Sequence, residues 1–319
     1  MISRRALIPR LALLGAAGGA LWLVRDRLPW LGPEVAFAGG TPTPWLPITG
    51  GGGLLEVDVR VNGTPVRAVI DSGAQVSAID SGLAQRLKLP RTTALPFLAY
   101  GVSGRPKVTH TVALDLNVPG FSATGVRAAT LDLRRLSGIG GRDFAMLIGR
   151  DILSRTVVEA DLPGRRLRLL PPGGYQPPRD ALAVPIQMRQ GAPLVEVRIE
   201  DGPAIQVLLD TGASNLLALS SATARRSGLA MTALASAPSV GLGGVSLSRQ
   251  VQVRTLRIGD LVVRNTPVQI YDPAQAATAG LLGSGLLRGH RYALDLPGGR
   301  LVITPPTPLV VPPPRRRLR

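Results

Sequence analysis

The feature that most constrains this chain is a short motif that occurs twice. In both copies an apolar run leads into an acidic residue, which is followed by a hydroxyl residue, a glycine and an alanine. The copies occupy residues 68–74 and 207–213, and their acids are Asp71 and Asp210. A carboxylate after so apolar a run is costly to bury unless it is hydrogen-bonded or partnered. The matching contexts predict that each of these two acids is the partner of the other.

The repeat continues on both sides of this motif. The pattern in each copy predicts the same elements in the same order. They are a strand with alternating apolar and polar residues, a turn, a return strand that ends at the acid, a short strand, a short helix that begins with serine, a hairpin with glycine, an apolar-apolar-Gly turn and a closing hairpin. In order, the first copy has these at residues 55–61, 62–63, 66–70, 76–79, 81–89, 100–104, 147–153 and 161–164, and the second at residues 194–199, 201–202, 205–209, 216–219, 220–229, 241–244, 281–287 and 295–299. The chain is therefore predicted to be a duplication with two related lobes.

The composition agrees with a β protein. The 319 residues include 38 glycines and 29 prolines, 45% are hydrophobic and only 3% are aromatic, which favours many turns between short strands. We predict an all-β fold with short helices, in which a pseudo-twofold axis relates the two lobes and brings one acid of each to a shared site between them. The absence of cysteine excludes disulfides, thiolate metal sites and a cysteine nucleophile.

Breaks in the pattern predict the domain boundaries. A proline- and glycine-rich stretch separates the two copies, and another precedes the first copy. The predicted segments are a targeting segment at 1–38, a linker at 39–53, a first lobe at 54–172, an interlobe linker at 173–180, a second lobe at 181–304 and a Pro/Arg-rich tail at 305–319.

The targeting segment has the features of a bacterial export signal. Arg4 and Arg5 precede a mildly apolar run at residues 11–24, shorter than the roughly 20 residues of a spanning helix. Residues 36–38, Ala-Phe-Ala, offer a cleavage site, although the charged residues 25–27 before it are unusual. We expect a periplasmic protein or one anchored to the outer face of the inner membrane; an uncleaved membrane anchor is the alternative.

The net charge is +17, and 35 of the 37 basic residues are arginine. The arginines are scattered except at the C-terminus and form no basic patch interleaved with aromatics, so we expect no nucleic-acid partner. A basic face that attracts an anionic membrane remains an alternative. His110 and His290 lie in unrelated contexts, and no metal site or organic cofactor is expected.

These motifs resemble the aspartic protease clan, specifically its retropepsin-like branch with two fused lobes. The resemblance rests on Asp-Ser/Thr-Gly-Ala and on the downstream Leu-Ile-Gly-Arg-Asp-Ile-Leu of residues 147–153; residues 210–216 also approach the pepsin-type version. It covers about residues 54–303. It implies an aspartic endopeptidase that acts on polypeptides without a cofactor. It also implies two retropepsin/pepsin-like β-barrel lobes with the active site between them, and a catalytic unit complete in one monomer.

The resemblance also implies roles for single residues. Asp71 and Asp210 would share one proton and activate a water as a catalytic dyad. Ser72 and Thr211 would bond across the axis, and Gly149 and Gly283 would pack beneath the active-site loops. The remaining loop residues would be Gly73, Ala74, Gly212 and Ala213, and the flap or substrate-binding residues would be Tyr100, Gly101, Gly104, Gly243 and Gly244. Gln75 stands where the branch commonly has an acid, so main-chain contacts with substrate are expected to differ there.

Other functions remain open at this point. A peptide-binding or regulatory protein on the same fold would need no catalysis, and a membrane-tethered processing protease would differ in substrate and not in chemistry. The simplest alternative takes Asp71 and Asp210 as two turn acids of an ordinary β domain. The complete duplicated context favours the enzyme.

Overall fold

The computed structural model describes residues 32–50, 54–92, 97–99, 107–134, 144–229, 235–241, 244–271 and 279–304. All of the helices and strands described below lie in one unit, Pro33–Arg319. Strands make up most of this unit, as the alternating patterns predict.

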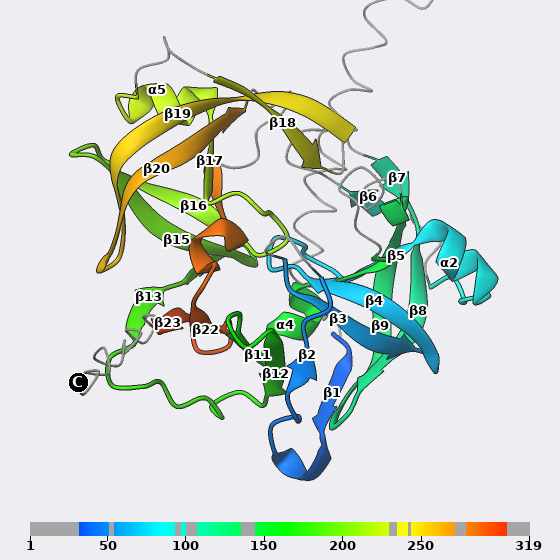
Figure 1. Ribbon diagram of the computed structural model, residues 1–319. Coiled ribbons are helices and arrows are strands. Elements are labelled where there is room, and N and C mark those ends of the chain that lie inside the picture. Colours follow the sequence, from blue (N-terminus) through cyan, green and yellow to red (C-terminus); the bar gives the residue numbers. More distant parts are fainter. Residues whose placement is uncertain are drawn as a thin grey trace, which may run out of the picture. The chain divides into compact units, whose positions relative to one another are not determined.

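Six strands of the first half close into a barrel (Figure 1). In the order in which they pair, they are β9 (Phe121–Leu131), β5 (Ala78–Asp80), β10 (Met146–Ile148), β4 (Thr64–Ile70), β3 (Glu56–Val61) and β8 (Thr111–Val118). Because β8 also pairs with β9, the barrel has no open edge between them. The alternation in β3 directs Val57, Val59 and Val61 into the core, where all three are buried.

The second half repeats this arrangement. The corresponding strands are β20 (Leu261–Tyr271), β17 (Leu217–Ser220), β21 (Gly280–Gly283), β16 (Ala204–Asp210), β15 (Ala192–Ile199) and β19 (Gly244–Ile258), and β15 pairs with β19 to close the barrel. Two further strands extend this sheet, β14 (Gln187–Arg189) and β18 (Ala235–Gly241). Each barrel contains the same two parallel pairs, β4–β10 and β5–β9 in the first and β16–β21 and β17–β20 in the second. The prediction of two related β-barrel lobes is confirmed.

The helices are short and occupy equivalent places in the two lobes. They are α2 (Ser81–Arg86), α4 (Arg150–Leu153) and α5 (Ser221–Arg226), with the 3-10 turn η2 (Ser284–Leu287) as the counterpart of α4. Asp80 and Ser220 cap α2 and α5. Both helices end earlier than the sequence pattern predicts, because Lys88 and Gly228 adopt positive φ angles of 51° and 74°.

A third sheet takes three strands from each half. In order, its strands are β13 (Leu182–Pro185), β23 (Arg300–Thr304), β22 (Arg291–Asp295), β11 (Val157–Asp161), β12 (Arg166–Leu170) and β2 (Leu46–Pro47). At its centre, β11 of the first half pairs with β22 of the second along five residues. This antiparallel pair ties the two lobes together through backbone hydrogen bonds.

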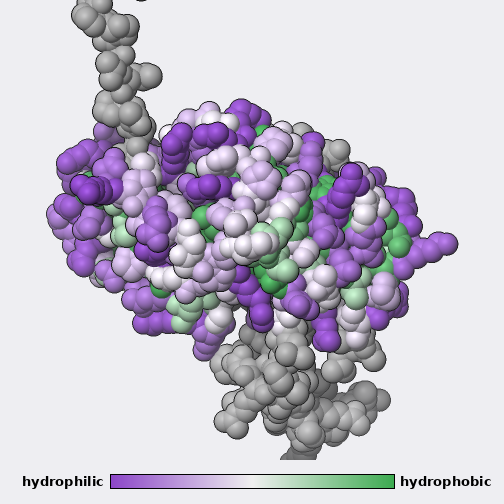
Figure 2. Space-filling model, turned by 90° about the horizontal axis from the view of Figure 1, so that it is seen from below, coloured by the Kyte–Doolittle hydropathy of each residue, from purple (hydrophilic) through white to green (hydrophobic). Residues whose placement is uncertain are grey.

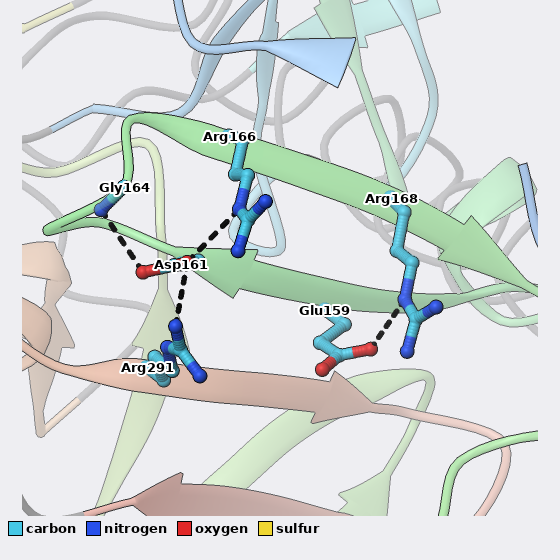
Figure 3. Close-up of polar contacts among 6 residues, drawn as sticks. All are labelled: Glu159, Asp161, Gly164, Arg166, Arg168 and Arg291. Carbon is cyan, nitrogen blue, oxygen red and sulfur yellow. Dashed lines mark hydrogen bonds and ion pairs between the residues drawn. The ribbon is translucent and has the colours of Figure 1, made fainter. Parts of the chain in front are cut away.

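A buried acid reinforces that junction (Figure 3). The carboxylate of Asp161 accepts hydrogen bonds from the Gly164 N–H at 2.9 Å and from Arg166 Nε at 3.0 Å, and it also pairs with Arg291 of the other half at 3.1 Å. Asp295 repeats the turn with Gly298 and Arg300. These are the two closing hairpins that the repeat predicts.

The structure differs from the sequence prediction before residue 54. Glu34–Phe37 forms β1, which pairs with β9, and Ala38–Gly40 forms the 3-10 turn η1. Phe37 packs edge-on against Phe121, and β2 pairs with β12. The predicted targeting segment and linker therefore contribute two strands to the sheets. Strands of two and four residues are too short to carry a recognisable period, which is why the pattern did not reveal them.

Hydrophilic residues cover most of the face in Figure 2, with smaller hydrophobic areas between them. Among the described residues, none of the helices has the length and apolar character needed to cross a bilayer.

Candidate active site

Asp71 and Asp210 each stand at the end of a strand whose position a parallel neighbour fixes. Asp71 directly follows β4, and its N–H donates to the carbonyl of Ile148 in β10 at 2.9 Å. Asp210 is the last residue of β16 and lies opposite Gly283 in β21. The parallel strand in each barrel thus sets where its acid leaves the sheet.

Two hydroxyl side chains join the acid loops of the two lobes. The Ser72 N–H donates to Thr211 Oγ1 and the Thr211 N–H donates to Ser72 Oγ, both at 3.0 Å. Each hydroxyl then donates to a carbonyl of the opposite lobe, Ser72 to Leu209 at 2.7 Å and Thr211 to Ile70 at 2.8 Å. Both side chains are buried, so the four bonds form a closed network that holds the loops in register.

This network places the two carboxyl groups beside each other, because Gly73 of the first loop lies against the Asp210 carboxyl and Gly212 of the second loop lies against the Asp71 carboxyl. Asp210 is buried and Asp71 is partly exposed. Asp71 Oδ1 also accepts the N–H groups of Gly73 at 2.9 Å and Ala74 at 3.1 Å, and Asp210 Oδ1 accepts the N–H of Gly212 at 3.0 Å. Each carboxyl is therefore oriented by its own loop and meets its partner from the other lobe.

The two acids have unequal electrostatic surroundings. Burial raises the pKa of Asp210, and the neighbouring charge of Asp71 raises it further, to well above its ordinary value. Burial also raises the pKa of Asp71, but the Ala74 N–H, the Asp210 carboxyl and the Arg150 guanidinium oppose that rise. Such a pair holds one proton over a wide pH range and can present a carboxylate and a carboxylic acid side by side.

Gly73 and Gly212 each lie against the acid of the other lobe. A Cβ atom on Gly73 would stand 2.5 Å from Cγ of Asp210, and a Cβ on Gly212 would stand 2.5 Å from Cγ of Asp71. Any side chain at either position would push the two carboxyl groups apart. The motif needs glycine here because of this close approach.

The apolar-apolar-Gly turns lie beneath the acid loops in both lobes. A Cβ on Gly149 would be 2.6 Å from the Val76 backbone, and one on Gly283 would overlap the Asn215 carbonyl oxygen. The next residue in each turn donates its N–H to an alanine carbonyl of the loop, Ala74 at 2.9 Å or Ala213 at 2.8 Å. The two alanines thus tie the acid loops to the turns.

The sequence pattern predicted no role for Arg150, although this residue lies in the downstream motif at residues 147–153. Arg150 is buried, and its Nη1 donates to the carbonyls of Ser72 and Gly73, both at 2.8 Å. These carbonyls belong to the two residues that follow Asp71. A comparison of the two turns carries the signal: arginine follows Gly149, whereas serine follows Gly283.

Asp151 and Ser77 were also missed. Asp151 Oδ1 accepts the Ser77 N–H at 2.9 Å and the Ser77 hydroxyl at 2.8 Å, and the Gly149 N–H donates to Ser77 Oγ at 3.1 Å. Burial raises the pKa of Asp151 to about 6, although the bonds from Ser77 oppose the rise. The carboxyl therefore fastens the segment after the first acid to the turn below it.

Two hairpins stand where the sequence predicts flaps. The first is β6 (Phe97–Ala99) with β7 (Lys107–Thr109), and the second is β18 with β19. Gly244 opens β19 opposite Gly241 of β18. The other predicted flap residues, Tyr100, Gly101, Gly104 and Gly243, lie outside the described residues.

Within the described ranges, no group of three or more His, Asp or Glu side chains could hold a metal ion. His110 instead lies beside Thr130 on β9, and the hydroxyl of that threonine donates to the His110 carbonyl at 3.1 Å.

Comparisons with known proteins give a family match in both lobes. The family profile described as aspartyl protease matches residues 57–152 and again residues 195–286, together more than half of the chain. A retropepsin-like aspartic protease from Rickettsia conorii has 21% sequence identity, and the match covers 39% of this chain and 89% of that one with a TM-score of 0.30.

A curated relative matches over a shorter stretch. The UBA domain-containing protein Mud1 of Schizosaccharomyces pombe is 33% identical over 124 residues, which are 36% of this chain and 33% of that protein. The matched stretch thus spans about a third of the length of this relative. The profile matches twice, once on each acid and its downstream glycine turn, and the chain therefore belongs to the aspartyl protease family.

Proposed function

We propose that this protein is an aspartic endopeptidase, which hydrolyses peptide bonds with a water activated by Asp71 and Asp210. The observation that carries the proposal is the close approach of the two acid loops, one from each lobe, in which Gly73 lies against the Asp210 carboxyl and Gly212 lies against the Asp71 carboxyl. The closed hydroxyl network and the two glycines without room for a Cβ support it, because they hold that contact in place.

The chemistry requires one proton on the pair. The ionised carboxylate takes a proton from a water held between the acids, and the resulting hydroxide attacks the carbonyl carbon of the scissile peptide bond. The protonated carboxyl donates its proton to the carbonyl oxygen as that oxygen gains charge. When the tetrahedral intermediate collapses, the carboxyl that took the proton from the water gives it to the amide nitrogen, which leaves as an amine. One hydroxyl of the intermediate returns its proton to the other carboxylate and becomes the carbonyl oxygen of the product acid, so the pair again holds one proton.

The substrate class follows from the family, whose members act on polypeptides. We propose that the β6–β7 and β18–β19 hairpins close over an extended peptide, and that Gln75 leaves the first lobe with a neutral contact at that part of the substrate. Because one chain supplies both acids, a monomer suffices for catalysis. We propose export to the periplasm or to the outer face of the inner membrane, supported by Arg4, Arg5 and the apolar run after them.

Cleavage of a random peptide pool by the purified full chain tests the proposal. Asp71→Asn and Asp210→Asn should each reduce kcat/KM by about a thousandfold or more, because each removes one half of the acid–base pair. Asp58→Asn is the matched control, since Asp58 is an exposed acid on β3 that pairs with Arg67. Its activity should equal that of the wild type.

Two results would overturn the proposal. One is activity that survives either dyad substitution. The other is a wild-type protein that binds peptides but cleaves none of them at any pH from acid to neutral. That second result would identify a peptide-binding protein on this fold.

A further inference from the structure

The two acid loops rest on turns that differ in charge. The turns are equivalent, because the N–H of Arg150 donates to the Ala74 carbonyl at 2.9 Å and the N–H of Ser284 donates to the Ala213 carbonyl at 2.8 Å. Arg150 brings a cation to the first lobe, whereas Ser284 brings a neutral hydroxyl to the second. The duplication is therefore broken directly below the two carboxyl groups.

The position of Arg150 matters because its guanidinium is buried. Arg150 Nη1 donates to the Ser72 and Gly73 carbonyls, both at 2.8 Å, which holds its charge against the two residues that follow the first acid. A buried cation interacts with a nearby carboxylate more strongly than a surface cation does, because little water screens the pair. In the other lobe the Ser284 hydroxyl donates to the Ala213 carbonyl at 2.8 Å and adds no net charge.

We propose that Arg150 is a positioning residue that makes the two acids unequal, so that Asp71 carries the negative charge of the dyad and Asp210 carries its proton. This inference rests on the proposed function and refines it. Asp71 is then the general base that activates the water, and Asp210 is the acid that donates to the carbonyl oxygen. The first lobe supplies the charge and the second supplies the proton.

The electrostatics of the pair agree with this assignment. Burial raises the pKa of both acids. For Asp71, the N–H groups of Ala74 and Gly73 and the positive charge of Arg150 oppose that rise, whereas the charge of Asp71 raises the pKa of Asp210 further. Among the described residues, the cation that lowers the pKa of Asp71 is Arg150 of α4. In the second lobe Arg288 donates to the Ser214 carbonyl at 3.0 Å, but its side chain is exposed, so water screens its charge. Asp151 follows Arg150 on the same turn but directs its carboxylate to Ser77.

The primary experiment needs no activity. A ¹³C-carboxyl NMR titration of the full chain, with the two signals assigned through Asp71→Asn and Asp210→Asn, reports which carboxyl ionises first. The proposal expects Asp71 to ionise first in the wild type. Ionisation of Asp210 before Asp71 would overturn it, whether or not the protein cleaves peptides.

Variants of Arg150 then isolate the charge. In Arg150→Met, the apparent pKa of the first ionisation should rise by about one unit, with an equal shift of the acidic limb of the kcat/KM profile. Arg150→Lys keeps the charge and should stay close to the wild-type profile. Ser284→Ala is the control in the second lobe and should leave the order of ionisation unchanged.

A purely structural role for Arg150 would give a different pattern. Activity would then fall by the same factor at every pH, and the apparent pKa of the first ionisation would stay at its wild-type value in Arg150→Met. That outcome contradicts the proposal. If Arg150→Met does not fold, the wild-type titration and the Arg150→Lys profile still decide the question. A wild type that cleaves nothing would refute the enzyme, while the NMR order would still test the charge assignment.

Discussion

The turn at Gly149-Arg150-Asp151 and the turn at Gly283-Ser284-Gly285 do the same mechanical task with different chemistry. In the first lobe, charged side chains fasten the acid loop, through Arg150 to two carbonyls and through Asp151 to Ser77. In the second lobe, the N–H of Gly285 donates to the Asn215 carbonyl at 3.0 Å, and the charged side chain that bonds the acid loop is the exposed Arg288, which donates to the Ser214 carbonyl at 3.0 Å.

The two lobes are symmetric at the acid loops, where they meet, and they differ at the turns beneath those loops. The hydroxyl network and the two glycines are reciprocal across the axis, because the two carboxyl groups must approach each other closely. The turns beneath them are free to differ, because a charged side chain in one lobe and a backbone N–H in the other can each bond a carbonyl of the acid loop.

The largest effect on activity should come from substitutions in the symmetric acid loops. Gly73→Ala and Gly212→Ala should each lower kcat/KM by at least about a hundredfold and cost about 1–3 kcal/mol of stability, since each added Cβ overlaps the opposite carboxyl. The two losses should be similar. Gly125→Ala is the control, because a Cβ there meets nothing within 4 Å and costs only backbone strain. Peptide-cleavage assays and thermal unfolding measure both quantities; full activity in either variant would contradict the close approach.

The next effect should separate the two turns. Because folding raises the pKa of Asp151 from 3.8 to about 6, its ionised form is disfavoured in the folded protein. Its contribution to stability is thus fully present below about pH 4 and is lost as the pH rises through about 6. Asp151→Asn keeps an oxygen that accepts both Ser77 bonds and removes the ionisation. Its free energy of unfolding, relative to that of the wild type, should therefore rise by about 2–3 kcal/mol as the pH increases from about 4 to about 8.

Denaturant unfolding at several pH values measures this difference. Asp58→Asn, at an exposed acid, is the matched control and should show no comparable pH-dependent gain. A stability difference between Asp151→Asn and the wild type that does not change with pH would mean that the Asp151 carboxyl titrates alike in the folded and unfolded chains.

A smaller effect on stability should show that the hydroxyl network depends equally on Ser72 and Thr211. Ser72→Ala and Thr211→Ala should each cost about 1–3 kcal/mol, because each leaves a buried N–H of the other lobe without its acceptor. The double variant should cost less than the sum of the two by more than about 0.5 kcal/mol, since the bonds are shared. A double-mutant cycle on unfolding free energies tests this; strict additivity would show that the two hydroxyls act independently.

The sequence predicts the architecture because the duplication presents each strand, turn and motif pattern twice, in the same order. Strict alternation before Asp71 and before Asp210, in the same order with similar intervals, identified two related barrels and named both acids. The network of Ser72 and Thr211 is also readable from the motif once the acids are paired. These features depend on local pattern and on the symmetry between the copies.

What the sequence did not reveal depends on contacts between distant segments. The strands β1 and β2 are held by pairing to β9 and β12 and by the Trp45 ring, which lies 4.6 and 4.8 Å from the guanidinium groups of Arg166 and Arg168. Strands this short show no alternation of apolar and polar residues by which the sequence could predict them. Similarly, the roles of Arg150 and Asp151 emerge only when the turn is seen beneath the acid loop, because their partners lie more than 70 residues away in the sequence.

The central claim is that one chain brings Asp71 and Asp210 together into a single site. The measurement that tests it most directly is kcat/KM for the wild type, for Asp71→Asn, for Asp210→Asn and for an equimolar mixture of the two variants. We predict cleavage by the wild type alone, with both variants and their mixture reduced by about a thousandfold or more. Activity in either single variant, or activity restored by mixing them, would contradict a dyad built within one chain.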